Sequence, residues 1–550
     1  MKTETAWVKP PPQVGGLDHL AVQAPCINVY GRLLPGITNV TDRARYYSFY
    51  PWLIWAFDQR GWTKYDDEFV ERFRRADCLF SMISLRHALV SEDHYDDHAR
   101  AMIGSNTLGP VVRELKSSAS VAISDYSKRT GAKARYFANK LGGLGQYYLG
   151  VLRELAILDG DARSGLKYTH QLGQLIAERL DNGIERRVFM DMVEADVVST
   201  RELDFLKALC PCHLQENRGE ADILRDLFFA KDVFYDSEAM PRRRSLQSII
   251  QLSDLLAAEG SKLTQDTFRA CVYSGALPSG TLWEAPKSLI TNRQRWASYA
   301  RNELLSVAVQ GLFFALLDAY EESGLRMHSS AEIVRWFLTQ PETLSTVKEL
   351  GGNKSYRQLI KDSESWLPAI AHWTASDHEV ELTERIVELS SGLRSSECRQ
   401  KIMLLGMRAL IALGARRKVG HSGYADLVFE KGYFGYYPIN LLSFESHATQ
   451  TWVTLAGTEL LGWILLNWGI EVHLRVALRK LRGQSQSTFR LRPTDRGFEV
   501  VGVPQVTHTS PRFDQAVRIL KDIGALARSP SEGWVSSELG REIIEQGDAP

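Results

Sequence analysis

Residues 128–180, KRTGAKARYFANKLGGLGQYYLGVLRELAILDGDARSGLKYTHQLGQLIAERL, decide how the chain is interpreted, because a second stretch near the C-terminus repeats their plan. Residues 152–158 align without gaps with residues 520–526, and residues 168–173 align with residues 535–540. In each copy a short insert rich in Gly, Ser, Asp or Pro separates the two matched blocks. The sequence therefore predicts one structural module that is used twice.

The second copy indicates most clearly what each module should look like. Ser510, followed by proline, predicts a helix start, because its hydroxyl can cap an unpaired backbone N–H group. Apolar residues then recur at helical spacing until Gly524, which favours the left-handed conformation that ends a helix. Residues 526–528 and 533–535 are strand candidates around a turn, and Ser537 predicts the cap of a last helix.

A helix, a hairpin and a second helix in this order resemble the second half of a winged-helix domain. The first copy is similar, with residues 146–158 as the helix and residues 160–168 as the wing. The resemblance implies a mainly α-helical, multi-domain protein with two winged-helix-like modules that have short β-hairpin wings.

The length and composition of the chain indicate which class of protein to expect. With 550 residues, 44% of them hydrophobic and 24% charged, we expect a globular protein with several cores. The formal net charge is zero, so any binding to nucleic acid must come from local clusters. Six cysteines are too few for a disulfide scaffold in so long a chain, and residues 1–16 contain no apolar leader. We therefore expect a cytoplasmic protein.

Patterning along the chain predicts a series of helical regions. Apolar residues 304–320 and 452–470 are interrupted by polar side chains, so we expect core helices and no membrane partner. The predicted regions are an extended N-terminal arm (1–16), an aromatic-rich helical domain (17–125), a winged-helix-like module (126–183), a helical region (184–294), a helical block (295–483) and a C-terminal winged-helix-like module (484–550).

Two basic clusters accompany the two modules. Basic side chains with aromatic residues between them are typical of contacts with phosphates and bases, although a solvated helix face gives the same pattern. We expect Leu474, Leu478 and Leu481 to face the core beside the second cluster. The candidate nucleic-acid-binding residues are Lys128, Arg129, Lys133, Arg135 and Lys140 in the first cluster, and Arg475, Arg479, Lys480, Arg482, Arg490 and Arg492 in the second.

The stretch at residues 46–57 is unusually rich in aromatic side chains. Residues of this kind are usually buried, so we expect a core helix here; the alternative places Arg43, Arg45 and Tyr46 on a surface that binds nucleic acid or a partner. The stretch also faintly resembles uncharacterised bacterial proteins encoded near phage-defence and mobile-element genes. That resemblance implies a role in defence against phage or plasmids.

Arg416 and His421 resemble the Arg-x4–6-His signature of HEPN ribonucleases, in which a polar pair at a helix end cleaves RNA. The resemblance implies that these two residues are catalytic. Arg417 departs from the family pattern, because that position is commonly Asn or another polar residue. A cationic helix C-terminus facing the helix dipole is the alternative.

Two short motifs contain metal-ligand residue types. His94 and His98 are four residues apart, which would place both on one face of a helix. Cys210, Cys212 and His213 lie together, but no second Cys or His pair follows at zinc-finger spacing. We interpret the first motif as a solvated helix start and the second as a helix-end loop, and expect no metal site and no cofactor.

The sequence predicts a nucleic-acid-binding component of a multi-subunit bacterial complex, with DNA favoured over RNA and other protein subunits as partners. The alternatives are a HEPN-type ribonuclease and a protein-binding scaffold without catalysis.

Overall fold

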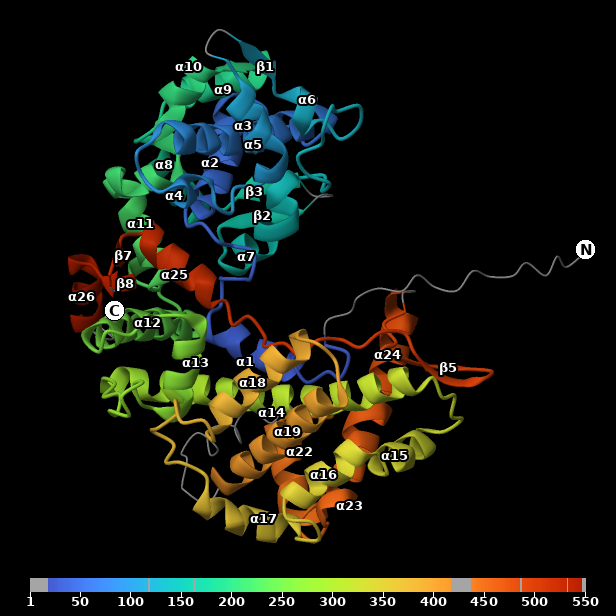
Figure 1. Cartoon of the computed structure of the whole chain (residues 1–550). Helices are drawn as coiled ribbons and strands as arrows, with labels where there is room; N and C mark the ends of the chain where they lie inside the picture. The colour runs from blue at the N-terminus through green and yellow to red at the C-terminus, as the bar shows by residue number, and fades with distance from the viewer. Residues whose placement is uncertain are drawn as a thin grey trace, which may run out of the picture. The chain divides into compact units, whose positions relative to one another are not determined.

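The computed structural model describes residues 18–116, 119–161, 165–416, 437–484, 487–531 and 533–546. These residues are mainly helical, and their strands form two-stranded antiparallel sheets (Figure 1), which confirms the mainly α class. The chain divides into two compact units. Unit 1 comprises Met1–Tyr30 and Thr264–Pro511, and unit 2 comprises Gly31–Leu263 and Arg512–Pro550, so the division falls inside α1 (Ala24–Leu33).

Unit 2 contains both copies of the sequence repeat. Its helices are α2 (Tyr46–Gln59), α3 (Asp67–Val90), α4 (Tyr95–Ala99), α5 (Ser105–Glu114), α6 (Ser124–Ser127), η1 (Leu144–Tyr148), α7 (Leu149–Glu154), α8 (Gly173–Asp181), α9 (Arg186–Ala195), α10 (Thr200–Phe205), η2 (Leu206–Leu209), η3 (Pro211–Glu216), α11 (Arg218–Phe228), η4 (Asp232–Phe234), η5 (Ser237–Ala239), α12 (Met240–Ala258), α25 (Phe513–Asp522) and α26 (Glu538–Glu545). Its strands are β1 (Ser120–Ala122), β2 (Leu158–Asp161), β3 (Gly165–Tyr168), β4 (Val197–Ser199), β7 (Leu526–Ser529) and β8 (Gly533–Ser536).

The aromatic helix α2 lies at the centre of unit 2. Every residue from Tyr46 to Phe57 is buried, which confirms the predicted core helix. The rings of Phe49 and Phe80 of α3 stack with centroids 4.0 Å apart. Arg43 and Arg45 are also buried, with 3% and 1% of their surface exposed, so the alternative of a surface formed by these residues is wrong.

Unit 1 is built around one long helix. Its elements are α13 (Gln265–Ser274), α14 (Lys287–Ser323), α15 (Ser330–Leu338), α16 (Pro341–Glu349), α17 (Tyr356–Asp362), η6 (Ser363–Ser365), α18 (Glu379–Ser391), α19 (Ser396–Arg416), α22 (Leu441–Ser446), η8 (His447–Thr451), α23 (Gly457–Trp463), η9 (Ile464–Ile470), α24 (Glu471–Gln484), β5 (Leu491–Thr494) and β6 (Gly497–Val500). In Figure 1, α14 runs through the middle of this unit, with α18 and α19 packed against it.

Two glycines allow the close packing of α14. A Cβ atom on Gly311 would lie 2.8 Å from Ile386 of α18, and one on Gly406 of α19 would lie 3.2 Å from the Ala308 carbonyl of α14. Among the described residues, α14 alone is long and apolar enough to cross a membrane, and its apolar window is entirely buried in the unit. Core helices of soluble proteins pass the same test, so this is weak evidence for a membrane span.

The two copies of the repeat have the same hairpin register. Leu158 pairs with Tyr168 and Asp161 with Gly165 in β2–β3, while Leu526 pairs with Ser536 and Ser529 with Gly533 in β7–β8. By its place in the hairpin, Tyr168 therefore corresponds to Ser536. The sequence alignment instead places Tyr168 opposite Val535, one residue earlier. The predicted order of helix, hairpin and helix is present in both copies, with α7 and α8 around the first hairpin and α25 and α26 around the second.

The turn between helix and hairpin is also built in the same way in both copies. Ala156 and Gly524 have left-handed backbones, with φ of 52° and 81°. The Thr169 hydroxyl donates to the Ala156 carbonyl at 2.7 Å, and the Ser537 hydroxyl donates to the Gly524 carbonyl at 2.6 Å. The two copies differ by one residue only after these hydroxyls. The Thr169 hydroxyl accepts from the N–H group of Gly173, four residues later, whereas the Ser537 hydroxyl accepts from the N–H group of Gly540, three residues later.

Each hairpin is tied to a long helix that comes earlier in the chain. The Tyr168 hydroxyl donates to Asp58 of α2 at 2.9 Å, and the Ser536 hydroxyl donates to Asp254 of α12 at 2.6 Å. Figure 1 shows α12 beside β8 and α26. Both hairpins are therefore held by a side-chain hydrogen bond to a long helix.

Three predicted helix boundaries are wrong. Helix α25 begins at Phe513 rather than at Ser510, because Arg512 has a left-handed backbone with φ of 62° and its guanidinium donates to the Gly31 and Leu34 carbonyls. In the first copy the helix ends at Glu154, because residue 158 already belongs to the hairpin. The predicted helix at residues 452–470 starts only at Gly457.

A buried ionic network in unit 1 depends on His508. Its Nδ1 lies 3.4 Å from Glu303 of α14, which is 0% exposed, and its Nε2 lies 3.1 Å from Glu384 of α18. Burial alone would lower the pKa of His508, but its interactions with Glu303 and Glu384 raise the pKa above its ordinary value. Arg269 also lies 2.7 Å from Glu384, and despite burial His508 and Arg269 hold the pKa of Glu384 at about 2.

We predict that His508 makes the stability of unit 1 fall as pH rises. A group whose pKa is higher in the folded than in the unfolded state stabilises fully below its unfolded pKa of about 6.5, and this contribution is lost as pH rises through the folded value. The free energy of unfolding should therefore decline above pH about 6.5 in the wild type and less steeply in His508→Gln. Urea denaturation across pH 6–9 measures this difference. The exposed His328→Gln change is the control; equal slopes in all three proteins would contradict the prediction.

Candidate nucleic-acid interface

Three arginines of the second basic cluster form an exposed stripe on α24. Arg475, Arg479 and Arg482 are all exposed, and within the described ranges none of them forms an ion pair with a carboxylate. The buried face of the helix consists instead of Val472, His473, Val476 and Ala477. The prediction that Leu474, Leu478 and Leu481 face the core is wrong, because Leu478 is 52% exposed and the other two are only half-buried.

A buried histidine fixes α24 to the hairpin that follows it. Nε2 of His473 accepts from the N–H groups of Arg490 and Leu491 at 2.9 and 3.1 Å, and Nδ1 lies 3.1 Å from the His19 carbonyl. This pattern requires a neutral ring with the proton on Nδ1. Burial agrees with it, because it lowers the pKa of His473 to about 4. The arginine stripe is therefore carried by a rigidly held helix.

The hairpin β5–β6 contributes less positive charge than the sequence suggests. Arg492 pairs across the strands with Glu499, its Nε donating at 2.9 Å. Arg490 is half-buried, and burial lowers its pKa. Lys480 is also half-buried and donates to the Asp18 carbonyl at 3.0 Å. Of the residues predicted to bind nucleic acid in unit 1, the α24 stripe is the part that remains exposed and unpaired within the described chain.

The first basic cluster lies on a loop of unit 2 that we call the basic loop, residues 128–135. Lys128, Arg129, Lys133 and Arg135 are all exposed there. Lys133 is neutralised by Asp125, whose carboxylate lies 2.5 Å from Nζ. Lys140 lies outside the loop and is half-buried, with Nζ 5.5 Å from the ring centroid of Tyr65.

A buried arginine anchors the chain on both sides of the basic loop. Arg74 of α3 is 0% exposed, and its guanidinium donates to the carbonyls of Ser127, Phe137 and Asn139. The aromatic residue Tyr136, next to the loop, is also held in the interior, since its hydroxyl donates to Asp77 at 2.8 Å. The loop thus presents cations from a fixed backbone, but Tyr136 and Tyr148 are buried and cannot stack on bases.

Arg416 lies at the end of α19, buried in an ion pair. Only 5% of its surface is exposed, and its Nε and Nη2 donate to the two carboxylate oxygens of Glu379 at 2.7 and 3.0 Å. The Tyr273 hydroxyl donates to the same carboxylate at 2.5 Å. His421, the other predicted catalytic residue, lies outside the described residues. The guanidinium that the ribonuclease hypothesis needs is therefore occupied by Glu379.

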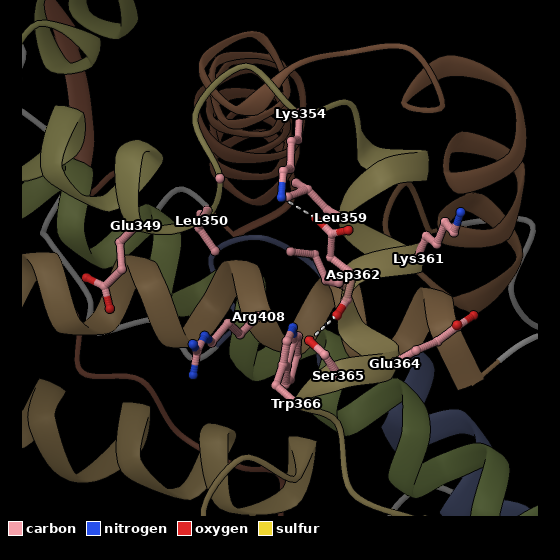
Figure 2. Close-up of a pocket in the computed structure, with 12 residues that line it drawn as sticks. Glu349, Leu350, Lys354, Leu359, Lys361, Asp362, Glu364, Ser365, Trp366 and Arg408 are labelled. Atoms are coloured by element: carbon pink, nitrogen blue, oxygen red, sulfur yellow. Dashed lines mark hydrogen bonds and ion pairs between the residues drawn. The ribbon is translucent and has the colours of Figure 1, made fainter.

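A pocket of about 720 Å³ in unit 1 is lined by three cationic side chains, those of Lys354, Lys361 and Arg408. Figure 2 shows Lys354 directed at Asp362 across the pocket, with Nζ 2.7 Å from the carboxylate. Arg408 lies over the Trp366 ring at 5.2 Å and pairs with Asp377 at 2.9 Å. Two of the three cations that border the pocket are thus already balanced, whereas Lys361 is exposed to solvent.

The structure also brings together four residues that sequence reasoning left apart. His87 of α3, His98 of α4, Cys210 and Cys212 each offer one ligand atom, and these atoms all lie within 4.8 Å of one another. His94 takes no part, because it is exposed and caps α4 by accepting from the Asp96 N–H group. The sequence signal was present in Cys-Pro-Cys and in His98, but the partners come from segments far apart in the chain.

Hydrogen bonds within this group favour a thiolate at Cys210. Burial would raise the pKa of Cys210, but donors from Cys212, His87 and His98 hold it well below its ordinary value. The hydrogen bond to Cys210 and burial raise the pKa of Cys212.

Comparisons of the chain with protein-family models, with characterised proteins and with solved structures found no match.

Proposed function

We propose that the chain binds nucleic acid, DNA in preference to RNA, as one component of a multi-subunit bacterial complex that acts in defence against phage or plasmids. The observation that carries the binding proposal is the stripe of Arg475, Arg479 and Arg482, which are exposed on a firmly held helix. Unpaired arginines at successive helical turns can each neutralise one phosphate of a nucleic-acid backbone. The exposed cations of the basic loop provide a second contact surface.

The two copies of the repeat are proposed to be winged-helix-like modules with different tasks. In the first copy the basic loop lies inside the module, ahead of its helix and hairpin, so this copy is proposed to contact nucleic acid. In the second copy the basic side chains of α25 are engaged within unit 2, because Arg518 pairs with Asp42 and Lys521 with Asp97. The second copy is therefore proposed to stabilise unit 2 or to contact another protein subunit.

Incubation with labelled double-stranded DNA, single-stranded DNA and RNA tests the proposal when both retention and cleavage are measured. We expect salt-sensitive retention, strongest on DNA, without cleavage. With about six phosphate contacts, log affinity should fall against log salt with a slope of roughly −4 to −5. Absence of retention on all three nucleic acids would overturn the proposal, and RNA cleavage that is lost in His421→Ala would establish the ribonuclease alternative.

We predict that the cations of the basic loop contribute unequally to nucleic-acid binding. Changing Lys128, Arg129 and Arg135 to Ala should make the salt slope about three units less steep, roughly one unit for each lost phosphate contact. Lys133→Ala is the matched control on the same loop, and it should change the slope much less because Asp125 already neutralises Lys133. Fluorescence anisotropy titrations at several salt concentrations measure both. A triple variant with an unchanged slope would show that the basic loop does not touch nucleic acid.

A further inference from the structure

The group formed by His87, His98, Cys210 and Cys212 has the composition of a tetrahedral metal site. Nδ1 of His98 lies 3.4 Å from Sγ of Cys210, and Nδ1 of His87 lies 3.3 Å from Sγ of Cys212. Zinc bonds of about 2.3 Å to sulfur and about 2.0–2.1 Å to nitrogen place tetrahedral S and N ligands about 3.6 Å apart. These two separations are within a few tenths of an ångström of that value, and all four ligand atoms lie within 4.8 Å of one another, so side-chain movements can bring them onto one zinc ion.

The four residues come from three segments, of which only the one in α3 belongs to a long regular helix. His87 lies in the last turn of α3, His98 in the five-residue helix α4, and the two cysteines flank Pro211 where η2 meets η3. Helices as short as α4, η2 and η3 are marginal on their own. A metal ion bound by all four residues would join the three segments at one point.

Two buried arginines hold the backbone of the α4 segment and the cysteine segment by hydrogen bonds to carbonyl groups. Nη1 of Arg45 donates to the carbonyls of Ala208 and Cys210 at 2.6 and 2.5 Å. Nη2 of Arg43 donates to the carbonyl of Asp97, next to His98, at 2.8 Å. Second-sphere contacts of this kind orient metal ligands. The sequence Arg43-Ala-Arg45 thus fixes both the cysteine segment and the α4 segment.

We propose that unit 2 contains a structural zinc site whose ligands are His87, His98, Cys210 and Cys212. Two thiolates balance the charge of Zn²⁺ when both imidazoles are neutral, so the complex carries no net charge into the interior. His98 and Cys210 are 0% exposed, and four protein ligands fill the tetrahedron, which leaves no open position for a substrate. The site therefore holds the fold and takes no part in chemistry.

A group of hydrogen-bonded side chains without metal explains the arrangement less well. Nε2 of His98 is buried and has no hydrogen-bond partner among the described residues; the carboxylate of Asp93 lies 3.9 Å away. A metal on Nδ1 fixes the proton on Nε2 and directs it toward this carboxylate, as in carboxylate–histidine–zinc triads. His213 lies close by but is directed elsewhere, since its Nδ1 is 2.7 Å from Glu216.

Metal content of the full chain tests the proposal. The wild type purified from zinc-supplemented culture should contain one zinc per chain by mass spectrometry of the metal. After removal by a chelator and loading with cobalt(II) chloride alone, it should give the visible bands of tetrahedral cobalt(II) and thiolate-to-cobalt charge transfer. The cysteines 210 and 212 should react with iodoacetamide only after chelation. These measurements need no variant and no nucleic acid, so their outcome is independent of the proposed binding function.

Variants then assign the ligands. Cys212→Ser and His87→Asn should reduce zinc affinity by tenfold or more, at least as much as loss of a second-sphere partner costs, which is about 10–100-fold. His94→Asn and His213→Asn are controls that keep one zinc per chain, because neither residue belongs to the group. A wild type without zinc and without thiolate-to-cobalt charge transfer would overturn the proposal, as would a disulfide between Cys210 and Cys212 in protein purified under reducing conditions.

Discussion

Replacing Glu220 by Gln should lower the free energy of unfolding of unit 2 by about 3–5 kcal/mol, the usual cost of removing one partner of a buried ion pair. Glu220 and Arg45 are 0% and 1% exposed, and the carboxylate accepts from Nε and Nη2 of Arg45 at 3.1 and 2.6 Å. The variant leaves the guanidinium buried without its counter-charge. Urea denaturation, with hydrogen exchange at α2 and α11 to assign the transition to unit 2, measures the loss.

Asp204→Asn is the matched control for this change. Asp204 pairs with Arg86 in the same unit, but their side chains are 41% and 21% exposed. An ion pair open to solvent is worth about 0–1 kcal/mol, so this variant should be almost as stable as the wild type. Equal effects of the two changes would contradict the role that we assign to burial.

Removing the charge of Arg45 as well should recover only part of the stability that Glu220→Gln loses. Replacing both Arg45 and Glu220 by apolar residues removes the buried charge, which in other ion pairs is neutral or stabilising. Here Arg45 also satisfies the carbonyls of Ala208 and Cys210, so the double change leaves one partly buried and one buried acceptor without this donor. The same two carbonyls belong to the segment that carries the proposed zinc ligands.

The repeated hairpins could be predicted from sequence because their signals are local. Gly524 predicts a left-handed helix end and Ser537 a helix cap, and both are present. The predicted cap at Ser510 failed because a distant contact decided the helix start, namely that of the Arg512 guanidinium with residues 31 and 34. Local chemistry was sufficient where the partners were close in sequence.

The group of histidines and cysteines could not be predicted, because its members are neighbours only in the fold. Zinc-finger spacing requires a second pair of ligands close along the chain, whereas His87 and Cys210 are brought together by the packing of η2 against α3. His94 was the more obvious partner for His98 by spacing. It lies at the cap of α4, where its ring accepts from a backbone N–H group.

The face that α24 buries was also beyond sequence analysis. The helix has two apolar stripes, one with Val472 and Val476 and one with Leu474 and Leu478, and helical periodicity alone gives no reason to choose between them. Packing of His473 against residues 490–491 selects the first. The arginines were expected to be exposed in either case, and they are.

Reversing the charge of the α24 stripe should have the largest effect on binding. Arg475, Arg479 and Arg482 changed to Glu place like charge against phosphate and remove three contacts, so the salt slope should become about three units less steep. Because all three side chains are exposed, the fold should be spared, with stability changes within about 0.5 kcal/mol for each substitution.

A control variant with the same change in net charge can be made in the same unit. Arg335, Lys348 and Lys361 are exposed on α15, α16 and α17, and changing these three to Glu alters the net charge by the same amount. A specific contact surface on α24 predicts that this control keeps a slope close to that of the wild type. A general effect of net charge predicts equal changes in both variants.

The most direct measurement is the affinity for a short DNA duplex as a function of salt concentration, for the wild type and these two triple variants. We expect a slope of roughly −4 to −5 for the wild type and the control, and about three units less for the α24 variant. A wild-type affinity that does not change with salt, or an α24 variant that binds with the wild-type slope, would contradict the proposal that this protein binds nucleic acid through α24.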